Sequence, residues 1–261
     1  MTTFILGPCL MESKELYLST AQTLAPLMSG RDWLYKSSFD KANRTAIGSK
    51  RGPGMKEALE WMKELKTLIP GIRLTTDVHE TTQCETLAQV IDCIQIPAFL
   101  CRQTDLLVEA GKHFNLVNVK KGQWISPTQA LHFLDKVRSE NPQAEVWITE
   151  RGTFFGYDRL TVDFSTVDLF RKHYSKVVLD CTHSTQQAQG SFTGGDRELA
   201  KRFMLTATTY RYNGIFAEVH PNPAHALSDA DSQIQLSQVK ELLKAFDAVQ
   251  KITAPLIQHE A

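Results

Sequence analysis

The stretch CIQIPAFLCRQTDLLVEAGKHFNLVNVK, residues 93–120, predicts the kind of fold this chain adopts. Residues 93–98 and 116–120 at its two ends are short β-like runs, whereas residues 104–114 between them have a helical pattern. A strand, a helix and a second strand in this order form a unit whose strands run parallel. The stretch therefore predicts a parallel sheet in which a helix joins each strand to the next.

The same alternation runs along the whole chain and gives eight strand–helix units. We predict strands at residues 4–8, 33–39, 73–78, 93–98, 116–120, 145–149, 176–180 and 214–219. We predict helices near residues 14–28, 55–68, 82–90, 104–114, 166–174, 197–209 and 236–251, and one that opens at Ser126-Pro127. Eight units favour a closed α/β fold, the (β/α)8 TIM barrel, over an open doubly wound sheet. No GxGxxG run follows a predicted strand, which disfavours a dinucleotide-binding sheet.

Length and composition narrow the class of protein. The chain has 261 residues, which fits one barrel domain over residues 1–261 because such barrels typically have about 250 residues. With 29 basic and 29 acidic residues its net charge is zero, so overall charge does not support a nucleic-acid or membrane-surface partner. The sequence shows no signal peptide, no run of roughly 20 apolar residues and no CxxC pair. We therefore expect a cytoplasmic protein with reduced cysteines.

Charged and polar side chains follow nearly every predicted strand. In barrels of this type the active site lies at the carboxyl ends of the strands. The residues at these ends are Cys9, Lys36, Lys41, Arg44, Asp77, His79, Gln95, Arg102, Lys120, Lys121, Glu150, Arg151, Asp180, His183, Glu218 and His220. Polar residues also end strands simply because loops contact water, but that does not explain a Lys or Arg after four strands of a neutral protein. Converging cations predict phosphate or carboxylate ligands.

A metal site is a second possibility at the same end of the barrel. Cys9, His183, Glu218 and an acidic residue in the loop after the last strand can meet there, because closure brings the first, seventh and eighth strands together. Thiolate, imidazole and carboxylate ligands together suit a divalent transition ion such as Zn²⁺ or Fe²⁺. A buried Cys and a rim His are also common without any metal, so residue types alone leave both readings open.

Several long motifs, in order, carry a resemblance that covers almost the whole chain. They are GPCLMES (7–13), YKSSFDKANRT (35–45), RGPG (51–54), TTDVHE (75–80), IQIPAFLCRQTDLL (94–107), VNVKKGQ (117–123), TERGTFFGYD (149–158), DCTHSTQ (180–186) and EVHPNPAHALSDADSQ (218–233). With these motifs the sequence resembles the 3-deoxy-D-manno-octulosonate 8-phosphate synthases. The resemblance implies a homotetramer of TIM barrels that condenses phosphoenolpyruvate with D-arabinose 5-phosphate and water for lipopolysaccharide biosynthesis.

The resemblance also implies roles for individual residues. The phosphoenolpyruvate site would contain Lys36, Lys41, Gln95, Lys120, Arg151 and His183. Arabinose 5-phosphate would contact Asn43, Arg44, Thr45 and, from a neighbouring subunit, Arg102. Cys9 in the first motif is typical of the metal-dependent class, whose divalent ion (Zn, Fe, Mn or Co) would be held by Cys9, His183, Glu218 and Asp229, with Asp231 as a nearby competitor. The catalytic groups would be His183, Asp229 and Lys41.

Two departures from the family pattern stand out. Thr45 occupies a position where the family usually has Ser, which keeps a hydroxyl for the phosphate. The loop at residues 187–195 looks shorter than usual and is followed by Asp196. Because that loop helps to close the site in the family, turnover or closure is expected to differ here.

Two rival functions share part of this pattern. The related 3-deoxy-D-arabino-heptulosonate 7-phosphate synthases, which use erythrose 4-phosphate, share the GPC, ERG and EVHP-type signatures. Their second loop has a KPRT-like run where this chain reads KANRT, and Asn43 favours the five-carbon sugar phosphate. The other rival is a catalytically silent barrel that binds a phosphorylated metabolite, and the full set of strand-end cations argues against it.

Overall fold

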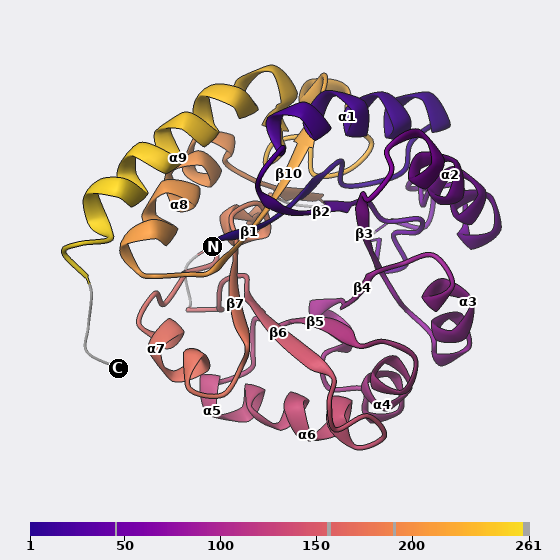
Figure 1. The fold of residues 1–261 in the computed structure, drawn as a ribbon, viewed down its shortest axis with the longest axis horizontal. Coiled ribbons are helices and arrows are strands. Elements are labelled where there is room, and N and C mark those ends of the chain that lie inside the picture. Colours follow the sequence, from indigo (N-terminus) through magenta and orange to yellow (C-terminus); the bar gives the residue numbers. More distant parts are fainter. Residues whose placement is uncertain (45, 156–157, 190–191, 258–261) are drawn as a thin grey trace.

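Parallel strands close into a barrel with the helices on its outside (Figure 1). The computed structural model describes residues 1–44, 46–155, 158–189 and 192–257. The barrel strands are β1 (Thr3–Gly7), β2 (Asp32–Lys36), β3 (Arg73–Asp77), β4 (Cys93–Ile96), β5 (Leu116–Lys120), β6 (Glu145–Glu150), β7 (Lys176–Asp180) and β10 (Gly214–His220). They pair in chain order, and β10 pairs with β1 to close the ring. The predicted (β/α)8 TIM barrel is confirmed.

The helices follow the strands as predicted, with local differences. They are α1 (Lys14–Leu27), α2 (Met55–Leu68), α3 (Cys84–Ala88), α4 (Thr104–His113), α5 (Pro127–Ala130), α6 (His132–Arg138), α7 (Thr166–Arg171), α8 (Arg197–Thr209) and α9 (Val239–Thr253). Ser13 caps α1 by accepting a hydrogen bond from the Leu16 N–H, as expected of an N-cap serine. Within the described part of the chain, no helix has both the length and the apolar character needed to cross a membrane.

Four segments differ from the sequence prediction. The expected helix at residues 82–90 is a 3₁₀ turn, Thr81–Gln83, followed by the short α3, because neighbouring β-branched threonines disfavour an α-helix. Two short helices, rather than one, follow β5. The loop expected after β7 contains an antiparallel pair, β8 (Gln187–Gln189) and β9 (Phe192–Gly194). A further short strand, β11 (Ile234–Gln235), extends the sheet beside β10.

The inside of the barrel is layered because alternate strand residues point inward. At the amino-terminal end, Asp32 accepts hydrogen bonds from Arg73 and Lys176. An apolar cluster follows, made of Ile5, Leu34, Cys93, Leu116, Trp147, Val178 and Phe216. The charged side chains at the carboxyl ends lie above this cluster, which gives them an apolar floor. A separate and larger core packs between the strands and the helices.

The backbone is tightly packed around Gly7, at the end of β1, and substitution of this glycine tests that packing. A Cβ at Gly7 would overlap the main-chain carbonyl oxygen of Lys36 on β2. We expect Gly7→Ala to lower the free energy of unfolding by about 1–3 kcal/mol, the usual cost of overpacking. Gly48→Ala is the matched control, because a Cβ there meets no atom within 4 Å. Denaturant titration of both variants measures the effect, and equal stability of the two would contradict this packing.

Candidate active site

A cavity of about 1040 Å³ lies at the carboxyl ends of the barrel strands. Its wall contains all six residues that the resemblance assigns to phosphoenolpyruvate, namely Lys36, Lys41, Gln95, Lys120, Arg151 and His183. Asn43, Arg44 and Asp229 also line it. Arg102 is exposed and outside this wall, and its carbonyl accepts a hydrogen bond from Lys136. Thr45 falls outside the described residues. The fold therefore gathers most of the predicted site from strands far apart in the sequence.

Lys36 forms the centre of the cavity floor. Its buried ammonium lies 3.0 Å from Glu218 Oε1 and 3.9 Å from Asp77 Oδ2, and it donates to the Cys9 carbonyl. The ring of Phe216 lies below, with the Lys36 ammonium 5.4 Å from its centroid. Since an apolar floor makes an unpaired charge costly, the two carboxylates are what keep this cation in place.

Asp77 completes the floor on the side of β3. It accepts hydrogen bonds from Ser38 and from the Gln95 amide. Burial alone would raise the pKa of Asp77, but the charges of Lys36 and Lys41 hold the pKa well below its usual range. The carboxylate therefore stays ionised and orients Gln95 toward the cavity wall.

A second ion pair orients His183. Lys120 Nζ lies 2.6 Å from Asp180 Oδ2, and His183 Nδ1 lies 2.8 Å from the same oxygen. Burial lowers the pKa of Lys120, and the charge of Asp180 opposes that shift. A carboxylate at Nδ1 favours the tautomer whose Nε2 carries a free lone pair. That Nε2 lies 3.8 Å from Glu218 Oε1.

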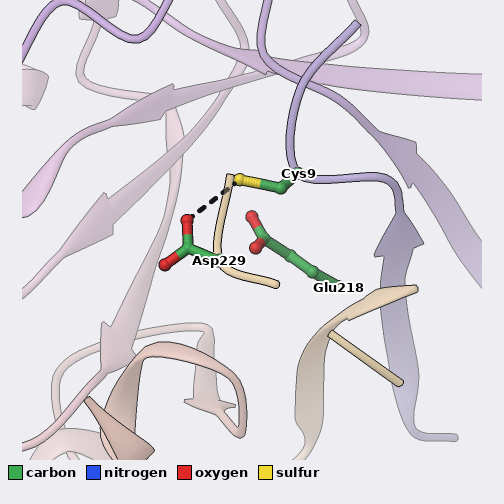
Figure 2. Close-up of side chains that lie close together, drawn as sticks. All are labelled: Cys9, Glu218 and Asp229. Atoms are coloured by element: carbon green, nitrogen blue, oxygen red, sulfur yellow. Dashed lines mark hydrogen bonds between the residues drawn. The ribbon is translucent and has the colours of Figure 1, made fainter. Parts of the chain in front are cut away.

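Three of the four predicted metal ligands lie together (Figure 2). The ligand atoms of Cys9, Glu218 and Asp229 are all within 4.8 Å of one another, and the thiol donates to Asp229 Oδ2 at 3.1 Å. Glu218 Oε2 is buried and accepts no hydrogen bond from the residues that the structure describes. A buried carboxylate oxygen without a partner, beside a thiol and a second carboxylate, fits a divalent cation. His183 lies at the edge of this group, next to Glu218.

The charges around Cys9 also fit a cation. Burial, and then the charge of Glu218, raise the pKa of the Cys9 thiol well above its usual range. Without a cation the thiol is therefore neutral, whereas a metal ion stabilises the thiolate and reverses the shift. Lys41 responds to the same anionic surroundings: burial would lower its pKa, but the carboxylates of Glu218, Asp77 and Asp229 hold that pKa above its usual range.

Arg151 joins the cationic wall of the cavity to the candidate metal ligands through Gln186. Its Nη2 donates to Gln186 Oε1 at 2.6 Å, and Gln186 Nε2 donates to Asp229 Oδ1 at 3.2 Å. Arg151 Nη1 is buried and donates to no acceptor among the described residues, and burial lowers the pKa of this guanidinium. An anion in the cavity is the natural partner for such a group.

Arg44 ties the β2–α2 loop to the loop that carries Asp229. Its Nη1 donates to Ser228 Oγ at 2.9 Å, and Ser228 Oγ donates to Asp229 Oδ2 at 2.8 Å. The residue-by-residue assignment from sequence gave no role to Ser228, Gln186 or Asp180. All three lie inside motifs that carried the resemblance, so their positions were visible, but their contacts depend on the fold.

Comparisons with known proteins agree with one another. The sequence model described as "DAHP synthetase I family" matches residues 1–254. Three similar proteins are named 2-dehydro-3-deoxyphosphooctonate aldolase. They come from Trichlorobacter lovleyi (41% identity, 97% of this chain and 93% of the relative), Fusobacterium nucleatum subsp. nucleatum (40%, 95% and 90%) and Chelativorans sp. (42%, 95% and 91%).

We expect Asp77, in the floor of the cavity, to make the free energy of unfolding depend on pH. Asp77 has a lowered pKa in the folded chain, so its contribution is complete above the unfolded pKa of about 3.9 and is lost as pH falls below it. At pH 7 we expect Asp77→Asn to lower the free energy of unfolding by about 1.5–3 kcal/mol, the range for a hydrogen bond to a charged group. The difference from wild type should shrink as pH falls below about 4.

Asp247→Asn is the control for this prediction. Asp247 pairs with Arg31 on the surface, where its side chain is 48% exposed, and such pairs contribute about 0–1 kcal/mol. Denaturant titrations at a series of pH values compare the two variants. An effect of Asp77→Asn that is no larger than the control, or that does not change with pH, contradicts the assignment of an ionised buried carboxylate.

Proposed function

Because the chain belongs to the DAHP synthetase I family, we propose that it is a 3-deoxy-D-manno-octulosonate 8-phosphate synthase. The name shared by its relatives describes the same product, since a 2-dehydro-octonate is an octulosonate. The reaction joins phosphoenolpyruvate, D-arabinose 5-phosphate and water, and releases inorganic phosphate. This is an enzyme of carbon–carbon bond formation, acting as one barrel domain.

One structural observation supports the proposal independently of the name that the relatives share. The cavity collects cations from separate strands, and part of their hydrogen-bonding capacity is free, as at Arg151 Nη1. Two phosphorylated substrates supply the anions that such a cavity lacks. A heptulosonate synthase would present a similar wall for phosphoenolpyruvate, so the shared name of the relatives and the KANRT run distinguish the two.

In the proposed chemistry, C3 of phosphoenolpyruvate attacks the aldehyde carbon of the sugar while water adds at C2. The bond between C2 and the phosphate oxygen then breaks, and phosphate leaves. Lys36, Lys120 and Arg151 hold phosphoenolpyruvate by its charges, and Gln95 is oriented by Asp77. Holding both reactants above an apolar floor strengthens each of these interactions and aligns the reacting carbons.

We assign the sugar phosphate to the β2–α2 loop. Asn43 and Arg44 line the cavity on that side, and Thr45 completes the run. We propose that Arg102 reaches this phosphate from a neighbouring subunit of a homotetramer, since within its own chain it is exposed and does not belong to the cavity wall.

We propose that the enzyme is metal-dependent and that Cys9, His183, Glu218 and Asp229 hold the ion. A divalent ion bound there would supply a Lewis acid beside the reacting atoms. His183 and Asp229 also face the cavity and are our candidates for proton transfer, with Lys41 as a fixed positive charge. A cytoplasmic place in lipopolysaccharide biosynthesis follows from the proposed product.

The choice of aldose decides between the two synthase activities. We expect phosphate release from phosphoenolpyruvate to require an aldose phosphate, and kcat/KM to favour arabinose 5-phosphate over erythrose 4-phosphate by about 10²-fold or more. A site built to bond each hydroxyl leaves its own groups unpaired when one is missing. A phosphate-release assay with each sugar measures this. Preference for erythrose 4-phosphate would reverse the assignment, and binding without phosphate release would support a silent barrel.

Chelation tests the metal. We expect a strong chelator to remove most of the activity and Zn²⁺, Mn²⁺ or Co²⁺ to restore it, because the thiol and the two carboxylates whose ligand atoms lie within 4.8 Å of one another would hold the ion. Cys9→Ser should lose activity in the same assay, whereas Cys84→Ser, a buried cysteine on α3, should keep it. Full activity after chelation, with no metal detected by elemental analysis, would exclude the metal centre.

A further inference from the structure

Gln233 connects the two loops that carry Cys9 and Asp229. Its Oε1 accepts a hydrogen bond from the Cys9 N–H at 3.2 Å, and its Nε2 donates to the Ser228 carbonyl at 2.8 Å. The side chain is fully buried, and the described cavity wall does not include it. Gln233 can therefore act on substrates and metal ligands only through the loops that it joins.

The backbone of Asp229 shows why that connection matters. Its φ is 47°, in the left-handed region, which is strained for a non-glycine residue and persists only where the surroundings enforce it. The Asp229 carbonyl accepts hydrogen bonds from the N–H groups of Ser232 and Gln233, both at 3.0 Å. Arg197 Nε in turn donates to the Gln233 carbonyl. Gln233 thus restrains this turn through its main chain and its side chain together.

Resting on the proposed metal centre, we infer that Gln233 is a positioning residue that sets the separation of Cys9 and Asp229, and thereby the affinity for a divalent ion. The primary amide suits this role because it presents an acceptor oxygen and a donor nitrogen on the same group. A carboxylate keeps the acceptor for the Cys9 N–H but has no donor for the Ser228 carbonyl. An aliphatic side chain of similar size keeps neither.

The test measures metal affinity directly, with zinc and cobalt(II) as the probes. Competition with a chromophoric chelator gives the zinc affinity of the metal-free protein, which should fall about 10–100-fold in Gln233→Leu and Gln233→Glu, the usual effect of losing a partner of a ligand. The absorption band from thiolate to cobalt(II) should weaken in parallel. Cys9→Ser identifies that band as belonging to Cys9.

Gln235→Leu is the matched control. Gln235 lies two residues away on β11, and its amide donates to the Pro221 carbonyl of the same loop without contacting a metal ligand. We expect this variant to bind zinc like wild type. Thermal unfolding of the metal-free proteins reports any general loss of stability, and affinities are compared well below each transition. If Gln233→Leu does not fold, Gln233→Glu decides.

The outcomes separate this inference from the proposed function. Wild-type affinity in the Gln233 variants, or an equal loss in Gln235→Leu, overturns the positioning role. A wild-type protein that takes up neither zinc nor cobalt overturns the metal centre and the inference with it. Weaker metal binding in the Gln233 variants, with no condensation of arabinose 5-phosphate by wild type, leaves the inference standing and refutes the assigned reaction alone.

Discussion

The pairing of β10 with β1 is the constraint on which the site depends. It sets Gly7 opposite Glu218, and Cys9 follows two residues later at the same end of the barrel. Residues near the two ends of the sequence thereby become neighbours at one rim. The close approach of Gly7 to the Lys36 main chain brings β2 into the same group. Without closure, the thiol and the two carboxylates would belong to unconnected segments.

Closure also concentrates charge above an apolar cluster, and the charges are tolerated because they alternate in sign. Lys36 lies between Asp77 and Glu218, and Lys120 lies between Asp180 and the ring of Phe216. In an apolar setting each ion depends on its partner. The same arrangement leaves Arg151 Nη1 and Glu218 Oε2 without partners in the described structure. Arg151 Nη1 can donate to an anion, and Glu218 Oε2 can bind a cation. These are the two kinds of ligand that the proposed reaction and the candidate metal centre require.

Hydrogen bonds between loops connect the charged residues of the barrel to the loops around the cavity. Asp229 accepts from Cys9, Ser228 and Gln186, which lead respectively to β1, to Arg44 and to Arg151. One carboxylate is therefore shared by the candidate metal centre and by the loops proposed to hold the two substrates. A residue in such a place has little freedom to move, which agrees with the restraints on its left-handed backbone.

The sequence by itself determined the barrel, because eight alternating units leave few other topologies, and it located the strand ends where the cations lie. It also supplied the family motifs, and with them Cys9 and Asp229 as candidate ligands. It did not determine that Gln233 contacts Cys9 across the closed ring, that Phe216 lies under two lysines, or that β8 and β9 pair. Those contacts join residues far apart in the chain or in turns without periodicity. Local propensity carries no information about them, so only the packing and hydrogen bonding of the closed barrel decided them.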